Sequence, residues 1–274
     1  MDKKQEDLKK EEKKASKLLD LKIDKITSKK LKKDNVKKIP LHNKYIIPNH
    51  PARVGFFGPS GSGKTNLLAM LMIKKLFYFK YFEQVFVFSP NFYIDEAYRI
   101  IEAKYGKSKK DATDIQAFEY LDEEVLQSII DQQKAICEED GVDLANRVLI
   151  VLDDCITEKA CNNNNRLFLQ LFVMSRHWGI SVWITSQSYK KLPITCRKNL
   201  SNLFMFEPSA NEAKSISEEH ETNVWPRKAL QEMIMAITRT KYSFAHCNKQ
   251  VHKNEQQWRM GLDYLIEPKE EKET

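Results

Sequence analysis

A glycine-rich stretch at residues 58–65, GPSGSGKT, has the residue types and spacing of a phosphate-binding loop. Gly58, Gly63, Lys64 and Thr65 fit the pattern G-x-x-x-x-G-K-[ST], and four of the chain's eight glycines fall between residues 55 and 63. Glycine lets successive backbone N–H groups turn inward around phosphate oxygens, where a side chain would block the approach. The stretch therefore predicts the binding of a nucleoside triphosphate.

The segments on either side of this loop suit the same chemistry. An apolar strand is expected at 53–57, and an amphipathic helix from Asn66 to about Tyr78. The N-terminus of such a helix presents unpaired N–H groups and partial positive charge to the phosphates. We expect Lys64 to bridge the β- and γ-phosphates of ATP and Thr65 to hold Mg²⁺. The expected nucleotide contacts are Gly58, Pro59, Ser60, Gly61, Ser62, Gly63, Lys64, Thr65 and Asn66.

Two adjacent acids end the most apolar segment of the chain, RVLIVL at 147–152. Asp153 and Asp154 follow directly, and an acid at the tip of a parallel strand faces the same edge as the phosphate loop. Asp153 is the expected partner of Mg²⁺, and Asp154 is placed to orient or deprotonate an attacking water. The alternative for each is a helix N-cap. A second acid beside the metal-binding one favours water as the acceptor, and hence hydrolysis.

A further strand end carries polar residues. ISVWIT at 180–185 runs into Ser186, Gln187 and Ser188. Gln187 is the candidate sensor of the γ-phosphate or of the attacking water, and an ordinary strand-end turn is the alternative.

Two arginines are candidates for a finger that reaches the nucleotide of a neighbouring subunit. Arg176 closes a helix predicted at 167–176, where a cation also suits the helix C-terminus. Arg197 is the second candidate, and the sequence does not choose between the two.

The elements that must position these residues alternate along the chain. Strands are expected at 53–57, 84–89, 147–152, 180–185 and 203–206, with helices between them, which indicates βαβ units and a mostly parallel sheet flanked by helices. Residues 95–140 read as mostly helical. After about residue 225 the alternation fades, with a short strand near 242–247 and a polar helix near 252–265. We expect an ATPase core at 41–225 and a C-terminal extension of the same domain at 226–274.

Charge is concentrated at the N-terminus. Residues 1–40 contain 15 lysines and 8 acidic residues, so this lysine-rich tail carries the whole net charge of +7. Two interpretations of this tail are possible from the sequence: a flexible, solvated segment, or a basic arm that contacts DNA or a partner. No apolar run is long enough to span a membrane. The five cysteines form no CxxC pair, which argues against a cysteine metal site.

Four strings in this order resemble a known family: GPSGSGKTNLL, VLIVLDDCI, MSRHWGISVWITSQSYKKLP and CRKNLSNLFMF. Together they are similar to the DNA-packaging ATPases of poxviruses and other large DNA viruses, which belong to the FtsK/HerA superfamily. The likeness covers roughly residues 50–220. Many members of the wider superfamily carry Asp-Glu at the acidic tip, whereas Asp154 is one methylene shorter.

The resemblance implies a P-loop NTPase fold of the RecA/FtsK-like, additional-strand type. It implies a homo-oligomeric ring that drives double-stranded DNA into a preformed capsid, with capsid or portal components as partners. It also implies a place in the host-cell cytoplasm, at the site of virus assembly, with the virion as a second location. The candidates for contacts to DNA are Lys104, Lys107, Lys109, Lys110, Lys190 and Lys191, and a solvated surface is the alternative for them. A small-molecule kinase and a nucleotide-switched interaction module are the alternative functions.

Overall fold

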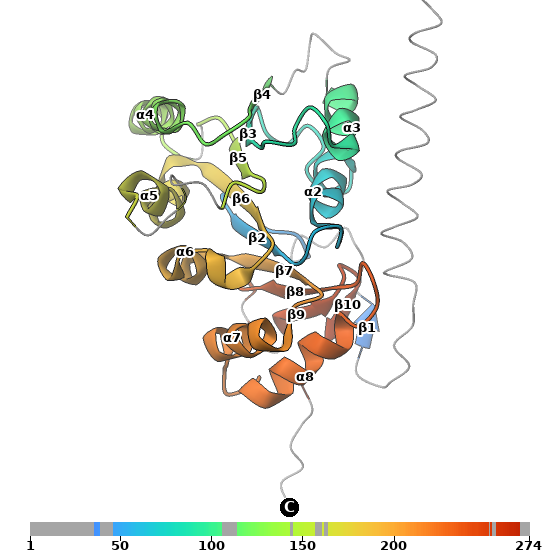
Figure 1. Cartoon of the computed structure of the whole chain (residues 1–274). Coiled ribbons are helices and arrows are strands. Elements are labelled where there is room, and N and C mark those ends of the chain that lie inside the picture. The colour runs from blue at the N-terminus through green and yellow to red at the C-terminus, as the bar shows by residue number, and fades with distance from the viewer. Residues whose placement is uncertain are drawn as a thin grey trace, which may run out of the picture.

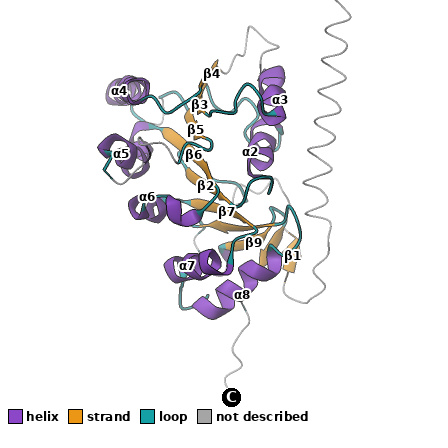
Figure 2. Cartoon of the chain, viewed as in Figure 1, coloured by secondary structure: helices purple, strands orange, loops and turns teal. Residues whose placement is uncertain are grey.

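The computed structural model describes residues 36–38, 46–105, 114–142, 145–156, 161, 164–251, 253 and 256–268. Its centre is one ten-stranded sheet with the strand order β1-β10-β9-β8-β7-β2-β6-β5-β3-β4. Helices cover both faces of the sheet, so the fold has three layers (Figure 1; Figure 2).

Six neighbouring strands form a parallel half-sheet. They are β7 (Asn202–Phe206), β2 (Arg53–Phe57), β6 (Ile180–Ser186), β5 (Val148–Leu152), β3 (Gln84–Phe88) and β4 (Asp114–Phe118). Strands β5, β6 and β7 are buried along their whole length, which is why their sequences are apolar runs and not alternating patterns. Because all six run the same way, their carboxyl ends meet at one edge of the sheet.

Four antiparallel strands extend the sheet beyond β7. They are β8 (Phe244–Asn248), β9 (Trp258–Met260), β10 (Tyr264–Ile266) and β1 (Val36–Lys38). Strand β8 therefore begins at the edge where β7 ends, pairing Phe244 with Phe206. Residues 36–38, part of the segment expected to be a tail, pair with β10; residues 1–35 lie outside the described residues.

The two faces of the sheet carry different helices (Figure 1). Helices α2 (Lys64–Ile73) and α3 (Glu96–Tyr105) cover one face. The other face carries α4 (Glu123–Asp140), α5 (Arg166–Met174), α6 (Ile194–Asn199), α7 (Ala210–His220) and α8 (Arg227–Ile237). Two short 3-10 helices, η2 (Ser175–Trp178) and η3 (Tyr189–Lys191), flank β6.

Strand β5 shows how the sheet divides the core. Val148, Ile150 and Leu152 pack toward the five-helix face, whereas Leu149 and Val151 pack toward α2 and α3. Successive side chains of a strand point to opposite faces, so a strand buried on both faces must be apolar at every position. This double burial holds β5 rigidly and fixes the position of the acids that follow it.

The predicted α/β class and mostly parallel sheet are confirmed. The additional-strand type is also confirmed, because β6 lies between the phosphate-loop strand β2 and the acid-bearing strand β5. Among the described residues, no helix combines the length and apolar character needed to cross a bilayer.

The prediction that residues 95–140 are mostly helical is confirmed by α3 and α4, although residues 114–118 form strand β4 because they pair with β3 at the edge of the sheet. Two local predictions were wrong. The polar helix expected near 252–265 is replaced by β9 and β10, which pair with each other and continue the sheet from β8. Helix α2 ends at Ile73 and not near Tyr78, since Tyr78 turns inward to pack against Phe82 and Trp183.

Candidate nucleotide site

The phosphate loop connects β2 to α2 at the carboxyl edge of the parallel half-sheet. Gly58 N donates to Ser186 O over 3.1 Å, which ties the start of the loop to the end of β6. A Cβ on Gly58 would lie 2.4 Å from Phe206 O, so only glycine fits there. Gly63 is the N-cap of α2 with a φ of 106°, a left-handed conformation that glycine adopts without strain. The loop is thus held from both sides by β6 and β7.

The start of α2 is suited to an anion. Its first turn contains no acidic residue, so no side chain of that turn competes for the unpaired N–H groups. Lys64 Nζ donates to Gly58 O over 2.7 Å and to Pro59 O over 2.9 Å, which folds the ammonium over the loop. Burial lowers the pKa of Lys64, and the charges of Asp153 and Asp154 oppose that shift. The cation is therefore directed at the space between the loop and the acids.

Asp153 is held by hydroxyl groups at the end of β5. It is 4% exposed, and its Oδ1 accepts a 2.6 Å hydrogen bond from Thr185 Oγ1. Its Oδ2 accepts a 3.3 Å hydrogen bond from Ser89 Oγ. Burial raises the pKa of Asp153, while the hydrogen bond from Thr185 favours the ionised form. These contacts fix the orientation of a buried carboxylate that faces the phosphate loop.

Thr185 joins the two acids. Its Oγ1 donates to Asp153 Oδ1 and accepts a 3.0 Å hydrogen bond from Asp154 N. Asp154 has a φ of 58°, a sparsely populated conformation for a residue other than glycine, which turns its side chain out of the strand direction. Gln187 Nε2 donates to Asp154 Oδ1 over 3.4 Å. The acid pair and the candidate sensor thus form one hydrogen-bonded unit across β5 and β6.

One cavity of about 410 Å³ brings together Lys64, Asp153, Asp154, Thr185 and Gln187. It is lined by Ser60, Gly61, Gly63, Lys64, Thr65, Asn66, Asn91, Asp95, Glu96, Asp153, Asp154, Thr185, Gln187 and Tyr242. The donor set fits Mg²⁺, which prefers a carboxylate and a hydroxyl oxygen together with phosphate oxygens, and Thr65 and Asp153 supply the first two. The cavity is polar, and its cationic and anionic walls face each other.

The sequence analysis missed several residues in and around this cavity. Ser89 does not line the cavity but supports Asp153, and it follows β3 as Asp153 follows β5. The rule that polar strand ends meet at one edge would have found it. Asn91 and Asp95 lie in the loop between β3 and α3, Glu96 is the first residue of α3, and Tyr242 lies in the turn before β8. Their places depend on tertiary packing, and no pattern in the sequence marks them.

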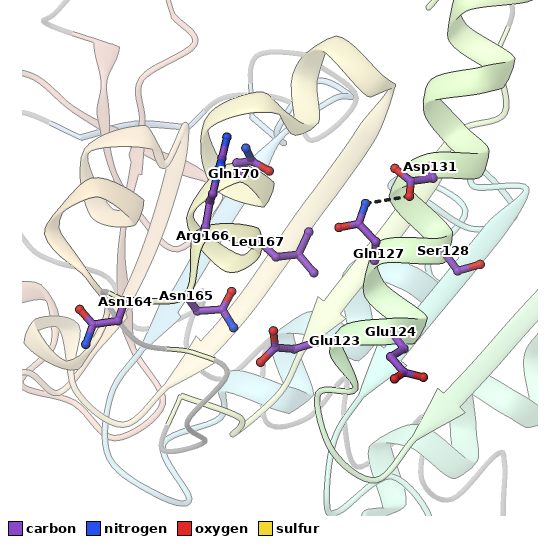
Figure 3. Close-up of a pocket in the computed structure, with 10 residues that line it drawn as sticks. All are labelled: Glu123, Glu124, Gln127, Ser128, Asp131, Asn164, Asn165, Arg166, Leu167 and Gln170. Carbon is purple, nitrogen blue, oxygen red and sulfur yellow. Dashed lines mark hydrogen bonds between the residues drawn. The ribbon is translucent and has the colours of Figure 1, made fainter.

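A larger cavity, about 1070 Å³, lies elsewhere between the N-terminal halves of α4 and α5 (Figure 3). Glu123, Glu124 and Asp131 line it, with Gln127 Nε2 donating to Asp131 Oδ2 over 2.8 Å. Carboxylates repel phosphate, and none of the described residues that line this groove is a glycine. Size therefore does not identify the nucleotide site, and the chemistry of the smaller cavity does.

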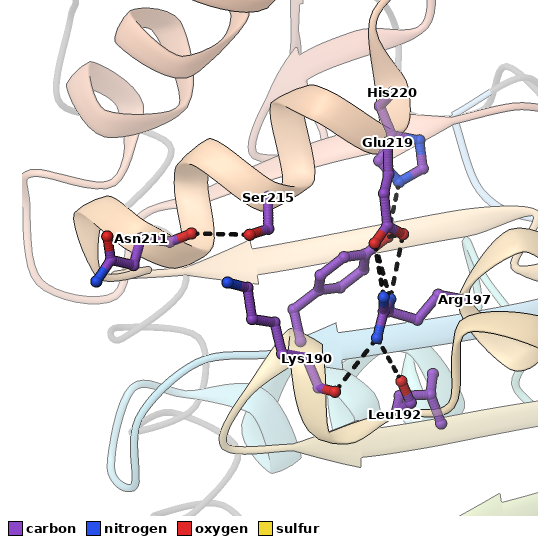
Figure 4. Close-up of polar contacts among 8 residues, drawn as sticks. Lys190, Leu192, Arg197, Asn211, Ser215, Glu219 and His220 are labelled. Carbon is purple, nitrogen blue, oxygen red and sulfur yellow. Dashed lines mark hydrogen bonds and ion pairs between the residues drawn. The ribbon is translucent and has the colours of Figure 1, made fainter. Parts of the chain in front are cut away.

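Arg197 lies in a polar network on the other side of the sensor segment (Figure 4). Its guanidinium pairs with Glu219 at 2.7 Å and donates to Leu192 O over 2.7 Å. The Arg197 side chain is 12% exposed and lies over the Tyr189 ring. An arginine that is committed to these contacts would have to break them to reach a neighbouring subunit, so this geometry favours a structural role over that of a finger.

Arg176 lies in η2, before β6 begins, and is exposed. This is the opposite end of β6 from the phosphate loop. Burial lowers the pKa of Arg53, the first residue of β2, and the nearby positive charge of Arg176 lowers it further. Arg176 is thus distant from the nucleotide cavity of its own chain. Its place in the last turn of η2 fits a cation at a helix C-terminus, and a role toward another subunit is the alternative.

The structure describes three of the six lysines that are candidates for contacts to DNA. Lys190 and Lys191 form η3, directly after the sensor segment, and both are exposed. Lys104 is in the last turn of α3. Lys107, Lys109 and Lys110 lie outside the described residues.

A glycine-rich loop between a parallel strand and a helix, facing a buried acid on a strand two positions away, defines a P-loop NTPase. The family model described as Poxvirus A32 protein matches residues 42–258. The chain therefore belongs to the poxvirus A32 protein family, and its resemblance to the packaging ATPases of large DNA viruses is confirmed.

Solved structures support the fold. The genome-packaging NTPase B204 of Sulfolobus turreted icosahedral virus 2, in complex with AMP, matches with a TM-score of 0.56 and 15% identity, over 78% of this chain and 98% of that chain. B204 of Sulfolobus turreted icosahedral virus, described as a DNA-packaging ATPase, matches with a TM-score of 0.55, 15% identity and the same coverage. The pCW3 conjugation coupling protein TcpA with ATPγS matches with a TM-score of 0.50 and 14% identity, over 85% of this chain and 66% of that chain. No curated protein sequence matches significantly.

Proposed function

We propose that this protein is an ATP-hydrolysing motor that translocates double-stranded viral DNA into a preformed capsid. The observation that carries the proposal is the assembly of Lys64, Asp153, Asp154 and Gln187 around one cavity, in a chain of the poxvirus A32 family. The structurally similar B204 proteins are described as genome-packaging enzymes, and one was solved with ATPγS.

Each residue has a role that its contacts support. The loop N–H groups and Lys64 bind and orient the triphosphate, because they supply positive charge where it carries most negative charge. Thr65 and Asp153 would hold Mg²⁺, which neutralises charge on the phosphate oxygens when bound. Asp154 accepts a proton from the attacking water, and Gln187, which is hydrogen-bonded to it, orients that water.

Coupling of ATP hydrolysis to DNA movement requires a structural connection between the nucleotide cavity and a basic surface. Gln187 is followed within three residues by the exposed Lys190. A change in the hydrogen bond of Gln187 to Asp154 on loss of the γ-phosphate would shift this short segment. Lys190 and Lys191 are therefore our candidates for contacts to the DNA backbone, which would be independent of sequence and sensitive to salt.

The assembly is proposed to be a homo-oligomeric ring in the host-cell cytoplasm, with Arg176 acting on the nucleotide of the adjacent subunit. A finger in trans must lie away from its own nucleotide, and the place of Arg176 at the far end of β6 satisfies this condition.

The test is steady-state ATP hydrolysis by the full chain, with and without linear double-stranded DNA, at low and moderate salt. We expect several-fold stimulation by DNA that fades with salt, and no turnover by Lys64→Ala. The Lys190→Ala, Lys191→Ala double variant should keep basal hydrolysis and lose the stimulation, with Lys75→Ala as a matched surface control. Hydrolysis that is indifferent to DNA would favour the kinase or the switch module instead.

A further inference from the structure

Tyr242 is the only aromatic residue among the described residues that line the nucleotide cavity. Every other lining residue is polar, charged or glycine, and suits phosphates, a metal ion or water. A nucleotide also carries a flat aromatic base, which needs an apolar surface against which to stack. Phosphate chemistry does not account for an aromatic ring at this position.

The strand order places Tyr242 at the correct end of the cavity. Asp153, Asp154 and Gln187 follow β5 and β6, which lie on one side of the loop strand β2. The γ-phosphate must lie there, because hydrolysis takes place beside the acids. Tyr242 precedes β8 in the chain. Strand β8 lies on the opposite side of β2, beyond β7 (Figure 1). A triphosphate bound along the loop therefore directs its nucleoside toward the Tyr242 side.

The ring contacts the phosphate loop itself. A Cβ built on Gly63 would lie 3.5 Å from Tyr242 Cδ1 and 3.7 Å from Phe206 Cε1. Phe206 is 1% exposed, whereas Tyr242 is only partly buried. Lys241 Nζ lies 5.0 Å from the centroid of the Tyr242 ring. The ring is thus fixed beside the start of α2 while part of its surface remains accessible.

Tyr242 has a backbone conformation that is strained for an aromatic residue. Ser243 N donates to Thr240 O over 2.9 Å, which closes a turn with Tyr242 at its third position. The φ of Tyr242 is 68°, a value at which glycine or asparagine is favoured and a bulky aromatic residue is an outlier. Strained residues cluster at ligand sites. A tyrosine at this position indicates a use for the ring.

We propose that Tyr242 is the platform on which the nucleotide base stacks. The inference rests on the proposed ATP-binding function and adds the residue that recognises the nucleoside. Stacking is tolerant of which base is bound, so the platform contributes affinity for nucleotides over bare polyphosphate more than it distinguishes ATP from GTP.

The test compares ATP with tripolyphosphate, which has the phosphates and lacks the base. Binding of each to the full chain is measured by calorimetry in the presence of Mg²⁺, for wild type, Tyr242→Ala and Tyr242→Phe. We expect Tyr242→Ala to weaken ATP binding about 10-fold and to leave tripolyphosphate binding unchanged. Tyr242→Phe keeps the ring and should bind ATP like wild type. Tyr120→Ala is the matched control, because Tyr120 is 62% exposed and does not line the cavity.

Two results would overturn the platform. Unchanged ATP binding by Tyr242→Ala would show that the base lies elsewhere. Equal weakening of ATP and tripolyphosphate would show that Tyr242 only supports the loop, which a lower thermal midpoint without ligand would corroborate. If wild type binds neither ligand, the proposed ATP-binding function itself fails, and the platform fails with it.

Discussion

Replacing Arg197 by alanine should destabilise the fold more than it affects catalysis. The substitution removes the partner of Glu219, whose side chain is 21% exposed, and leaves a largely buried carboxylate without its counterion. It also removes the donor to Lys190 O and Leu192 O and the cation over Tyr189. The network holds the segment after β6 against α7 (Figure 4).

The magnitude follows from these contacts. Removing one partner of a buried pair costs about 3–5 kcal/mol, and the residual exposure here places the expected loss near the lower end, about 3 kcal/mol. For a domain of this size each kcal/mol lowers the thermal midpoint by about 2–4 °C, so the expected fall is about 6–12 °C. The double variant Arg197→Met, Glu219→Gln removes both charges and should recover much of the loss.

The pH dependence provides a second signature. Burial raises the pKa of Glu219, but hydrogen bonds from Arg197 and Tyr189 outweigh it and hold the pKa below its usual value. A depressed carboxyl pKa stabilises the fold above the unfolded pKa, and this contribution is lost as the pH falls through the folded one. The stability difference between wild type and Arg197→Ala should therefore narrow as the pH falls below about 4.5.

The assay is differential scanning calorimetry of both variants and wild type, followed by ATPase measurements on mixtures with wild type. A wild-type thermal midpoint together with poisoning of wild-type subunits in the mixture would refute the structural role. Arg197 would then be the finger in trans.

Three further outcomes are expected. Asp154→Asn should bind ATP like wild type and lose hydrolysis by about 10²-fold or more, because the amide cannot accept a proton from water; wild-type turnover would remove Asp154 from that role. Arg176→Ala subunits mixed with wild type should depress ATPase activity more than simple dilution does, whereas additive dilution would argue against a finger. Burial lowers the pKa of His50 to about 4 and that of the fully buried His246 well below its usual value. Below pH about 6.5 these histidines bind protons in the unfolded chain but not in the folded chain. The free energy of unfolding therefore decreases as the pH is lowered, by about 1.4 kcal/mol per pH unit from His246 alone. Urea unfolding between pH 7 and pH 5 measures this slope, and His246→Asn should reduce it.

The features that the sequence predicted correctly depend on local interactions. The loop at 58–65 is recognisable because phosphate binding needs glycine at fixed spacing and a lysine at the helix start. Strands β5 and β6 are recognisable because burial on both faces makes every position apolar. The acids and Gln187 follow from the rule that parallel strands end at one edge.

Tertiary packing alone decided the rest. Strand β4 alternates exposed and partly buried residues, and it exists because β3 supplies hydrogen bonds along its length. The short strands β9 and β10 likewise form by pairing with distant neighbours. Arg197 pairs with Glu219 because α6 and the sensor segment pack against α7. Tyr242 reaches the cavity because β8 pairs with β7. Sequence spacing determines which residues can do chemistry, but contacts between segments far apart in the chain determine which of them meet.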